Sequence, residues 1–262
     1  MIVVKYGGHA LPTASVSDEN LQVIASYHQS GREIVLVHGG GPQVDAELAI
    51  HNISTEMVAG YRSTTPSVME IVHGVLAGQV CRTLVNQLIG FGVNAVGISA
   101  GDGSTIRAKK FRPTVNGEEI DIGLVGEIDQ VDPRLLSHLL EERYLPVMSP
   151  VAVTSSGQAL NLNGDIAAGA IGGALKADEV IFMTDVAGIY RNYPDTSSLI
   201  SKCTSSELRE LLPTFSAGML PKSKAALYAL DHGAKRVRVI DGRDAKNLIS
   251  ALDGVGGTVI TP

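Results

Sequence analysis

The chain has 262 residues, of which 44% are hydrophobic and 18% are charged, with a formal net charge of -6 at pH 7. A chain of this length and composition can bury a large core, as one α/β domain or as two lobes. Its negative charge gives no general attraction to nucleic acid or to anionic lipid, so we expect neither as a partner. Any binding of a small anion must therefore come from a local arrangement of residues.

The cysteines and the start of the chain point to a reducing compartment. Cys81 and Cys203 lie far apart, with no CxxC or Cys/His metal-ligand spacing, and we expect both to be reduced and structural. The chain opens directly on a strand, with no basic leader region, and no apolar run approaches bilayer-spanning length, about 20 residues. We therefore expect a cytoplasmic protein without a membrane segment.

Strands and helices alternate in the predicted elements. The first hundred residues predict strands over 1–6, 34–37 and 95–99 and helices over 15–30, 45–51 and 68–88. The middle of the chain predicts a surface β-hairpin over 109–120, an edge strand over 123–131, a helix over 132–142 and a buried strand over 145–153. The remainder predicts helices over 166–175, 205–212 and 218–231 and strands over 179–183, 236–240 and 257–260.

This alternation indicates an α/β fold in which helices cover both faces of a mainly parallel sheet. A fresh βαβ pattern follows the small-residue helix that starts near Gly164. We place a lobe boundary in that helix, which divides the chain into an N-terminal lobe of 1–170 and a C-terminal lobe of 171–262.

Two glycine-rich turns each follow a predicted strand. One is His38-Gly39-Gly40-Gly41, and the other is Lys5-Tyr6-Gly7-Gly8. Such turns leave backbone N–H groups free near a helix N-terminus, where they can hold an anion. The alternative is a tight βα connection that needs glycine for its backbone geometry. If the two strands are parallel neighbours, both turns point into one crevice.

Several polar residues stand at predicted strand ends or helix starts, and each has a purely structural alternative. Lys5, at the end of a buried strand, needs an anion unless its ammonium reaches solvent. Lys222, near a helix start, is either offset by an anion or simply solvated. Asp165 can be a helix cap or a functional carboxylate, and Arg62 can fork onto a carboxylate or brace its loop. His38 is interpreted as a strand-end histidine satisfied by the backbone.

The common nucleotide fingerprints are missing from the sequence. It contains no GxxxxGK[ST] and no GxGxxG with an acidic residue about twenty positions later. The zinc-binding HExxH pair is also missing, and we expect no GxSxG nucleophile motif. These expectations make a hydrolase or a metalloenzyme a weak interpretation.

Seven short motifs occur in order along nearly the whole chain. They are KxGG at 5–8, HGGG at 38–41, GxRxT at 60–64, NxNxD at 161–165, TDVxG at 184–188, GMxPK at 218–222 and GT at 257–258. With these motifs the sequence resembles the amino acid kinase family, and within it the members that act on N-acetyl-L-glutamate. The resemblance implies a three-layer αβα sandwich, with the acyl amino acid in the N-terminal lobe and MgATP in the C-terminal lobe.

Three groups of matching residues take their expected roles from this resemblance. Two lysines held by one carboxylate, with a glycine N–H beside them, would neutralise the phosphoryl group in transfer: Lys5, Lys222, Asp165 and Gly8. The acyl amino acid would be bound by Gly40, Gly41, Arg62, Asn161 and Asn163. The nucleotide would contact Gly7, Thr184, Asp185, Gly188 and Met219. Mg²⁺ would arrive bound to ATP, and no residue is expected to hold a metal by itself.

The implied reaction is ATP-dependent phosphorylation of the γ-carboxylate of N-acetyl-L-glutamate, in arginine biosynthesis. A carboxylate is already a nucleophile at pH 7, so the transfer needs alignment and charge stabilisation rather than a general base. Two alternatives stay open. One is a sibling kinase for an aminoadipate-type or carrier-linked amino acid, and the other is a non-catalytic subunit that senses nucleotide.

The assembly expected from the resemblance is a homodimer that arginine does not inhibit. Only Met1 to Val4 precede Lys5, which is too short for the N-terminal helix that builds hexameric rings in arginine-controlled members. The helix over 68–88 carries apolar residues at helical spacing, namely Val68, Ile71, Val72, Val75 and Leu76. These residues either form a dimer contact or are buried against the sheet.

Overall fold

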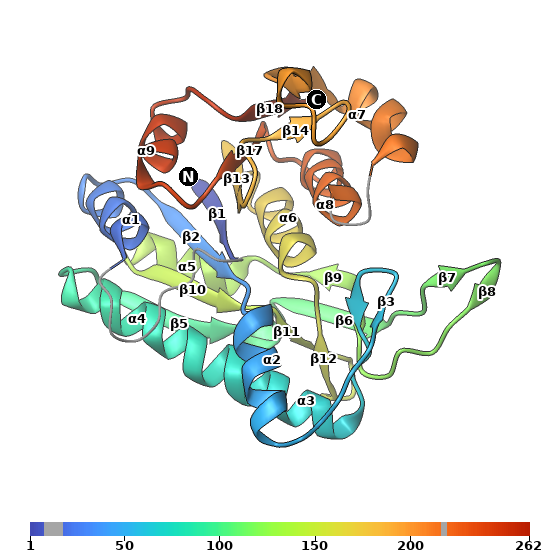
Figure 1. Ribbon diagram of the computed structural model, residues 1–262. Helices are drawn as coiled ribbons and strands as arrows, with labels where there is room; N and C mark the ends of the chain where they lie inside the picture. Colours follow the sequence, from blue (N-terminus) through green and yellow to red (C-terminus); the bar gives the residue numbers. More distant parts are fainter. Residues whose placement is uncertain (8–17, 216–218) are drawn as a thin grey trace.

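A computed structural model of the chain describes residues 1–7, 18–215 and 219–262 (Figure 1). Within that part of the chain, one eight-stranded sheet has the order β16-β18-β17-β13-β1-β2-β10-β5. Its strands are β1 (Ile2–Tyr6), β2 (Ile34–His38), β5 (Ala95–Ser99), β10 (Leu145–Ser149), β13 (Glu179–Thr184), β16 (Lys202–Thr204), β17 (Val237–Asp241) and β18 (Thr258–Thr261). Neighbouring strands are parallel except β17 and β18. The predicted mainly parallel sheet is confirmed.

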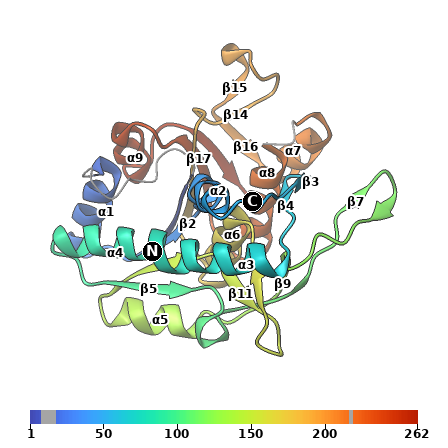
Figure 2. The same ribbon diagram turned by 60° about the horizontal axis from the view of Figure 1, so that its bottom comes forward.

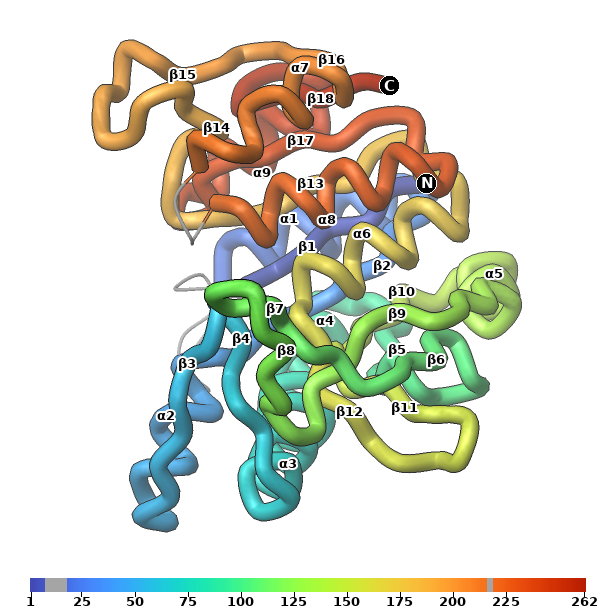
Figure 3. Tube along the Cα trace, turned by 90° about the vertical axis from the view of Figure 1, so that its right-hand side faces the viewer, coloured from blue at the N-terminus to red at the C-terminus, as the bar shows by residue number. Residues whose placement is uncertain are grey.

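The two central strands are buried along their whole length. β1 (IVVKY) and β2 (IVLVH) read as continuous apolar runs, which is the pattern of strands covered on both faces. Ile2 lies opposite Ile34 on one side and opposite Glu179 on the other, so β1 joins the two halves of the sheet. Strands from residues 34–149 therefore lie on one side of β1, and strands from residues 179–261 on the other (Figure 3).

Helices cover both faces of this sheet, as the sequence predicts. In Figure 2, α4 and α5 lie on opposite sides of β5. The layer that contains α4 also holds α1 and α9, and the opposite layer holds α6 and α8 (Figures 1 and 2). The bounds are α1 (Glu19–Gln29), α2 (Gly41–Ile50), α3 (Pro66–His73), α4 (Cys81–Gly90), α5 (Arg134–Glu141), α6 (Gly164–Ala174), α7 (Ser205–Leu211), α8 (Met219–Asp231) and α9 (Ala245–Leu252).

The helix predicted over 68–88 is longer and less regular than expected. It begins at Pro66, where Thr65 is the N-cap, continues as a π-helix over Gly74–Val80 and ends at Gly90. By length and composition alone this 25-residue segment could cross a membrane, and half of its most apolar window is buried in the protein. The expectation that no stretch reaches spanning length is therefore wrong, and packing into the core accounts for the apolar composition.

Burial also decides between the two alternatives for the apolar face of this helix. Val68, Val72 and Val75 are each 1% exposed within the single chain, and Leu76 is 5% exposed. They belong to the core of the fold. Only Ile71 is half-buried among the five residues named for a dimer contact, so the other four pack inward against the core.

The strand predicted over 145–153 is two strands in two different sheets. Proline at position 150 separates β10 from β11 (Val151–Val153), because it has no N–H to give to a sheet. β11 belongs to a second, four-stranded sheet with the order β12-β11-β6-β9. Its other strands are β6 (Ile106–Lys110), β9 (Gly126–Val131) and β12 (Ala159–Asn161). β9 lies at its edge, as predicted from the sequence.

Three short hairpins extend from the two sheets. They are β3 (Met57–Val58) with β4 (Tyr61–Arg62), β7 (Thr114–Val115) with β8 (Glu118–Glu119), and β14 (Ile189–Tyr190) with β15 (Leu199–Ile200). The second turns at Asn116-Gly117, which confirms the surface hairpin predicted there. The third stands out from the body of the protein (Figure 2).

Candidate active site

Two lysines and one aspartate meet at the carboxyl ends of the central strands. The Lys5 ammonium, from β1, lies 2.9 Å from Oδ1 of Asp165 in the first turn of α6. The Lys222 ammonium, from the first turns of α8, lies 3.3 Å from Oδ2 of the same carboxylate. We call this arrangement the lysine–aspartate bridge. It brings together three of the four residues expected around the phosphoryl group, and the fourth, Gly8, lies outside the described residues.

The bridge carries a net positive charge in a buried place. The side chains of Lys5 and Asp165 are 10% and 7% exposed, and that of Lys222 is 23% exposed. Burial alone would raise the pKa of Asp165, but the two ammonium groups outweigh it and hold that pKa below its ordinary value. One ionised carboxylate between two cations leaves an excess charge of +1, which favours binding of an anion at this point.

The start of α6 fixes the position of the shared carboxylate. Asn163 is the N-cap, and its side-chain oxygen accepts hydrogen bonds from the N–H groups of Asp165 (2.8 Å) and Ile166 (3.2 Å). A carboxylate in the first turn of a helix is also stabilised by the helix dipole. The motif NxNxD therefore encodes a capped helix start that presents Asp165 to both lysines.

The two glycine turns lie side by side, as predicted for parallel neighbours. The Gly39 N–H donates to the carbonyl of Tyr6 at 2.8 Å, and a Cβ on Gly39 would lie 3.7 Å from the Cα of Gly7. A Cβ on Gly7 would lie 2.5 Å from the Lys5 ammonium. Glycine at position 7 therefore leaves room for the Lys5 ammonium, which a side chain there would displace from the bridge.

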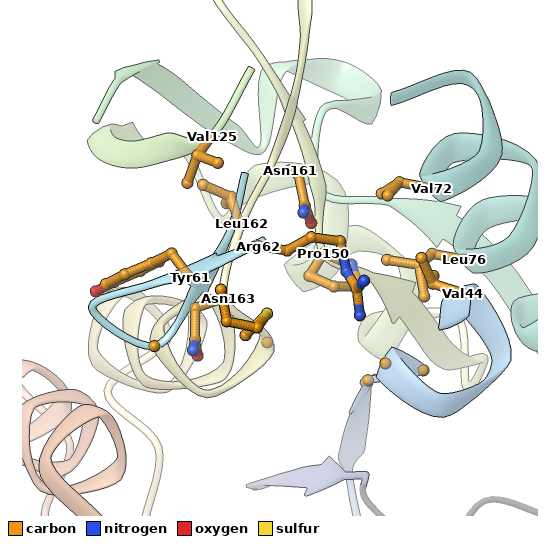
Figure 4. A pocket seen from close by; sticks show the side chains of 16 residues that line it. Val44, Tyr61, Arg62, Val72, Leu76, Val125, Pro150, Asn161, Leu162 and Asn163 are labelled. Carbon is orange, nitrogen blue, oxygen red and sulfur yellow. The ribbon is translucent and has the colours of Figure 1, made fainter. Parts of the chain in front are cut away.

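All five residues predicted to bind the acyl amino acid line one cavity of about 190 Å³ beside the bridge. They are Gly40, Gly41, Arg62, Asn161 and Asn163. Figure 4 shows the side chains of Arg62, Asn161 and Asn163 around this cavity, together with the apolar side chains of Val44, Leu76 and Leu162. The cavity thus offers amide and guanidinium donors on an otherwise apolar wall, which suits a small polar acid.

Two contacts orient the polar side chains of this first cavity. The Nδ2 of Asn161 donates to the Thr64 hydroxyl at 3.2 Å. A guanidinium nitrogen of Arg62 lies 2.6 Å from Oδ1 of Asp45, which belongs to α2. Asp45 is a residue that the sequence analysis missed, although it stands one turn after the glycines of HGGG.

A second cavity, of about 560 Å³, lies on the other side of the bridge and is lined by Lys222 itself. Two of the residues predicted for the nucleotide, Asp185 and Met219, line it. Gly7 instead packs beside Lys5. Thr184 is buried at the end of β13, where its hydroxyl accepts from the Val186 N–H at 2.9 Å.

His38 is held by the backbone, in line with its interpretation as a strand-end histidine. Its Nδ1 lies 2.7 Å from the carbonyl of Gly39 and must therefore donate to it. Burial lowers the pKa of His38 to about 4, and the nearby Lys5 cation contributes in the same direction. The imidazole is neutral at pH 7, and its Nε2 is buried without a hydrogen-bond partner among the described residues.

A serine motif also proves to be structural. Gly97-Ile98-Ser99-Ala100-Gly101 has the spacing GxSxG, so the expectation that this motif is missing is wrong. In hydrolases that motif is a sharp turn between a strand and a helix. Here Ser99 is the last residue of β5, and its hydroxyl accepts from Ser149 at 3.1 Å. The arrangement has no nucleophile turn.

The described residues do not build a metal site of their own. Within 1–7, 18–215 and 219–262, no group of three or more His, Cys, Asp or Glu side chains is placed to hold an ion. Each oxygen of Asp165 already faces an ammonium group.

Comparison with known proteins identifies the family. A family model described as "Amino acid kinase family" matches residues 1–241. The chain belongs to the amino acid kinase family.

Members of this family with curated names resemble the chain over most of its length. An acetylglutamate kinase from Arthrobacter sp. is 44% identical over 248 residues, which cover 92% of this chain and 80% of that protein. An acetylglutamate kinase from Salinispora tropica is 41% identical over 263 residues, which cover 100% of this chain and 89% of that protein.

Solved structures agree on the amino acid kinase fold. The structure of smu.665 from Streptococcus mutans matches with a TM-score of 0.81 and 27% identity, over 99% of this chain and 98% of that one. An N-acetylglutamate synthase from Neisseria gonorrhoeae, complexed with coenzyme A and N-acetyl-glutamate, matches with a TM-score of 0.85 and 23% identity. The chain spans 59% of that synthase, and the likeness is one of fold.

For this amino acid kinase, sequence motifs found the polar centre but missed the aromatic wall of the second cavity. The missed lining residues are Val186, Tyr190, Arg191, Asn192, Tyr193, Thr214 and Phe215. Four of them follow directly after TDVxG, so a cluster of two tyrosines and an arginine after that motif was the available signal. Tyr190 and Tyr193 pack edge to face, with ring centroids 5.7 Å apart.

Proposed function

We propose that the chain transfers the γ-phosphoryl group of ATP to the γ-carboxylate of N-acetyl-L-glutamate, in arginine biosynthesis. Relatives named acetylglutamate kinase, 41–44% identical over most of the chain, support this proposal. The structural observation that carries it is the lysine–aspartate bridge between two cavities of different size. Two ammonium groups between an acceptor cavity and a donor cavity suit phosphoryl transfer.

The first cavity is proposed to hold the acceptor. Arg62 would bind the α-carboxylate with its planar guanidinium, and the amides of Asn161 and Asn163 would bind the acetamido group. Gly40 and Gly41, at the start of α2, would offer their N–H groups to the phosphoryl oxygens. The γ-carboxylate would then lie toward the bridge.

In the proposed step, an oxygen of the γ-carboxylate attacks the γ-phosphorus, the bond from that phosphorus to the β,γ-bridging oxygen breaks, and ADP leaves. The products are an acyl phosphate and ADP. Lys5 and Lys222 would stabilise the negative charge on the phosphoryl group, and Asp165 would keep both ammonium groups in place. No proton has to be removed from the nucleophile, which agrees with the buried, neutral state of His38.

The second cavity is proposed to hold ATP. Tyr190, Tyr193 and Phe215 provide aromatic surface for a base, and Lys222 lies at the end nearest the bridge. Asp185 and Met219 would contact the nucleotide as the family resemblance implies, with Thr184 and Gly188 shaping the turn before them. Mg²⁺ would come with the ATP phosphates, where it neutralises charge and orients them.

The lobe assignment, the cellular location and the assembly complete the proposal. We assign the acyl amino acid to a lobe of 1–170 and the nucleotide to a lobe of 171–262, and we propose a cytoplasmic homodimer. The free, buried cysteines Cys81 and Cys203 support a reducing compartment. The half-buried strand β5, which ends the eight-stranded sheet, supports self-association. Light scattering at micromolar concentration tests the dimer.

A hydroxamate assay tests the reaction, because hydroxylamine traps an acyl phosphate. The assay is run with ATP and, in turn, N-acetylglutamate, glutamate, aspartate and acetylaminoadipate. We expect the highest kcat/KM with N-acetylglutamate. A preference for acetylaminoadipate would identify a sibling kinase instead, and tight ATP binding without turnover of any acid would identify a nucleotide sensor.

A further inference from the structure

One hydroxyl at the end of the chain holds the base of the β14–β15 hairpin. Thr258, the first residue of β18, is completely buried. Its hydroxyl oxygen accepts the N–H of Ile189 at 2.8 Å and donates to the carbonyl of Ile200 at 2.5 Å. Ile189 and Ile200 are opposite each other in the hairpin, so a single side chain bridges its two strands.

This hairpin forms one wall of the cavity proposed for ATP. Tyr190, Arg191 and Tyr193 line that cavity, and all three follow the residue that Thr258 holds. The hairpin stands out from the body of the protein (Figure 2) and pairs over only two residues per strand. A two-stranded ribbon this short is marginal by itself, so its position depends on how its base is attached.

The absence of a side chain at Gly188 makes room for the contact between Thr258 and the hairpin. A Cβ on Gly188 would lie 2.4 Å from the Thr258 hydroxyl oxygen. Glycine at the end of TDVxG therefore leaves the space in which the hydroxyl reaches the Ile189 N–H. The two short motifs TDVxG and GT, which lie far apart in the sequence, thus form one contact.

We propose that Thr258 is a positioning residue for nucleotide binding: its hydroxyl sets the hairpin base and so places the wall of Tyr190, Arg191 and Tyr193 against ATP. This inference rests on the proposed function of the second cavity. If the hydroxyl only satisfied two buried backbone groups, its loss would lower the stability of the fold and would change the KM for ATP and the KM for N-acetylglutamate alike. If the hydroxyl positions the cavity wall, its loss should instead raise the KM for ATP alone.

Steady-state kinetics of Thr258→Val and Thr258→Ser separate these roles. Valine keeps the shape and removes both hydrogen bonds, so we expect the KM for ATP to rise about tenfold while the KM for N-acetylglutamate stays within about twofold. Serine keeps the hydroxyl and should restore the KM for ATP to within about threefold of wild type. Thr261→Val, on the same strand and away from the hairpin, is the matched control. Equal changes in both KM values, or none, overturn the proposal.

Limited trypsin digestion gives a readout that does not depend on activity. Arg191 is exposed in the hairpin, and mass spectrometry identifies cleavage after it. We expect faster cleavage there in Thr258→Val, and wild-type rates in Thr258→Ser and Thr261→Val. An unchanged rate in Thr258→Val contradicts the role of Thr258. Faster cleavage with an unchanged KM for ATP would instead contradict the nucleotide assignment of the cavity.

A second variant covers the case in which Thr258→Val does not fold. Gly188→Ala leaves Thr258 in place but inserts a methyl group where the hydroxyl now lies. It should give the same selective rise in the KM for ATP and the same faster cleavage after Arg191. Wild-type behaviour of folded Gly188→Ala would overturn the proposal.

Discussion

The Arg62 guanidinium lies 2.6 Å from the carboxylate of Asp45 at the edge of the first cavity, and the two side chains differ greatly in exposure. Arg62 is 12% exposed and Asp45 is 62% exposed. One nitrogen of the largely buried guanidinium is thus paired with an exposed carboxylate, while its other N–H donors remain available to a ligand. Arg62 is thus the proposed carboxylate-binding residue, and Asp45 is the residue that orients it.

Replacing Arg62 tests carboxylate binding directly. Arg62→Ala should raise the KM for N-acetylglutamate by about 10- to 100-fold, because a charge-assisted bidentate contact is worth about 1.5–3 kcal/mol. The KM for ATP should change little. Steady-state kinetics with each substrate varied in turn measure both values. An equal rise for the two substrates would contradict the assignment.

Replacing Asp45 tests the orienting contact. An ion pair with one exposed partner is worth about 0.2–1 kcal/mol, so Asp45→Asn should raise the KM for N-acetylglutamate by at most about fivefold. The KM for ATP serves as the internal control. A fall in the KM for N-acetylglutamate would show that Asp45 competes with the substrate for Arg62.

Removing either lysine of the bridge should abolish most turnover. Lys5→Ala and Lys222→Ala are each expected to lower kcat by a factor on the order of a thousand, because an ammonium group at the transferring phosphoryl acts mainly in the transition state. Lys224→Ala is the matched control, since Lys224 is exposed on the same helix as Lys222. Near-normal turnover in either variant would remove that lysine from the catalytic set.

The shared carboxylate is tested by Asp165→Asn. The amide keeps the shape but no longer offsets two ammonium groups, so both lysines should lose their positions and kcat should fall more than the affinity for either substrate changes. Kinetics are compared with thermal unfolding of the same variant. A loss of stability with unchanged kcat would mean that Asp165 only stabilises the first turn of α6.

His38 should make the folded state sensitive to acid. Its pKa is about 4 in the folded chain and 6.5 ordinarily, so the unfolded chain binds more protons between these values. Stability is therefore complete above pH 6.5 and falls as the pH drops toward 4, by about 2 kcal/mol between pH 7 and pH 5. Urea unfolding of wild type and His38→Asn checks this. The variant should lose less stability over that interval, and identical losses would contradict the prediction.

Local sequence patterns predicted the elements and the polar centre well, because each signal was contained in a short stretch. β-branched runs located β1 and β2, and NxNxD located the capped start of α6 that carries Asp165. The motif residues of the first cavity were also grouped correctly. These features depend on neighbours in the sequence, which a pattern can represent.

Features that depend on distant contacts could not be predicted in this way. The apolar face of the helix at 66–90 gave no indication of whether it faced a partner or the core, and only the packed sheet decides this. The partnership of Arg62 with Asp45 requires the relative placement of β4 and α2. The bridging role of Thr258 likewise depends on three segments that meet only in the fold.

The central position of β1 has a consequence for folding during synthesis. β1 leaves the ribosome before β2 and β13 and can pair early with β2, but its other edge stays open until β13 has been made. Such non-local pairing is slow to form, and an unpaired apolar strand edge invites association with other chains. The strand that later carries Lys5 into the bridge is thus the part of the nascent chain that needs protection longest.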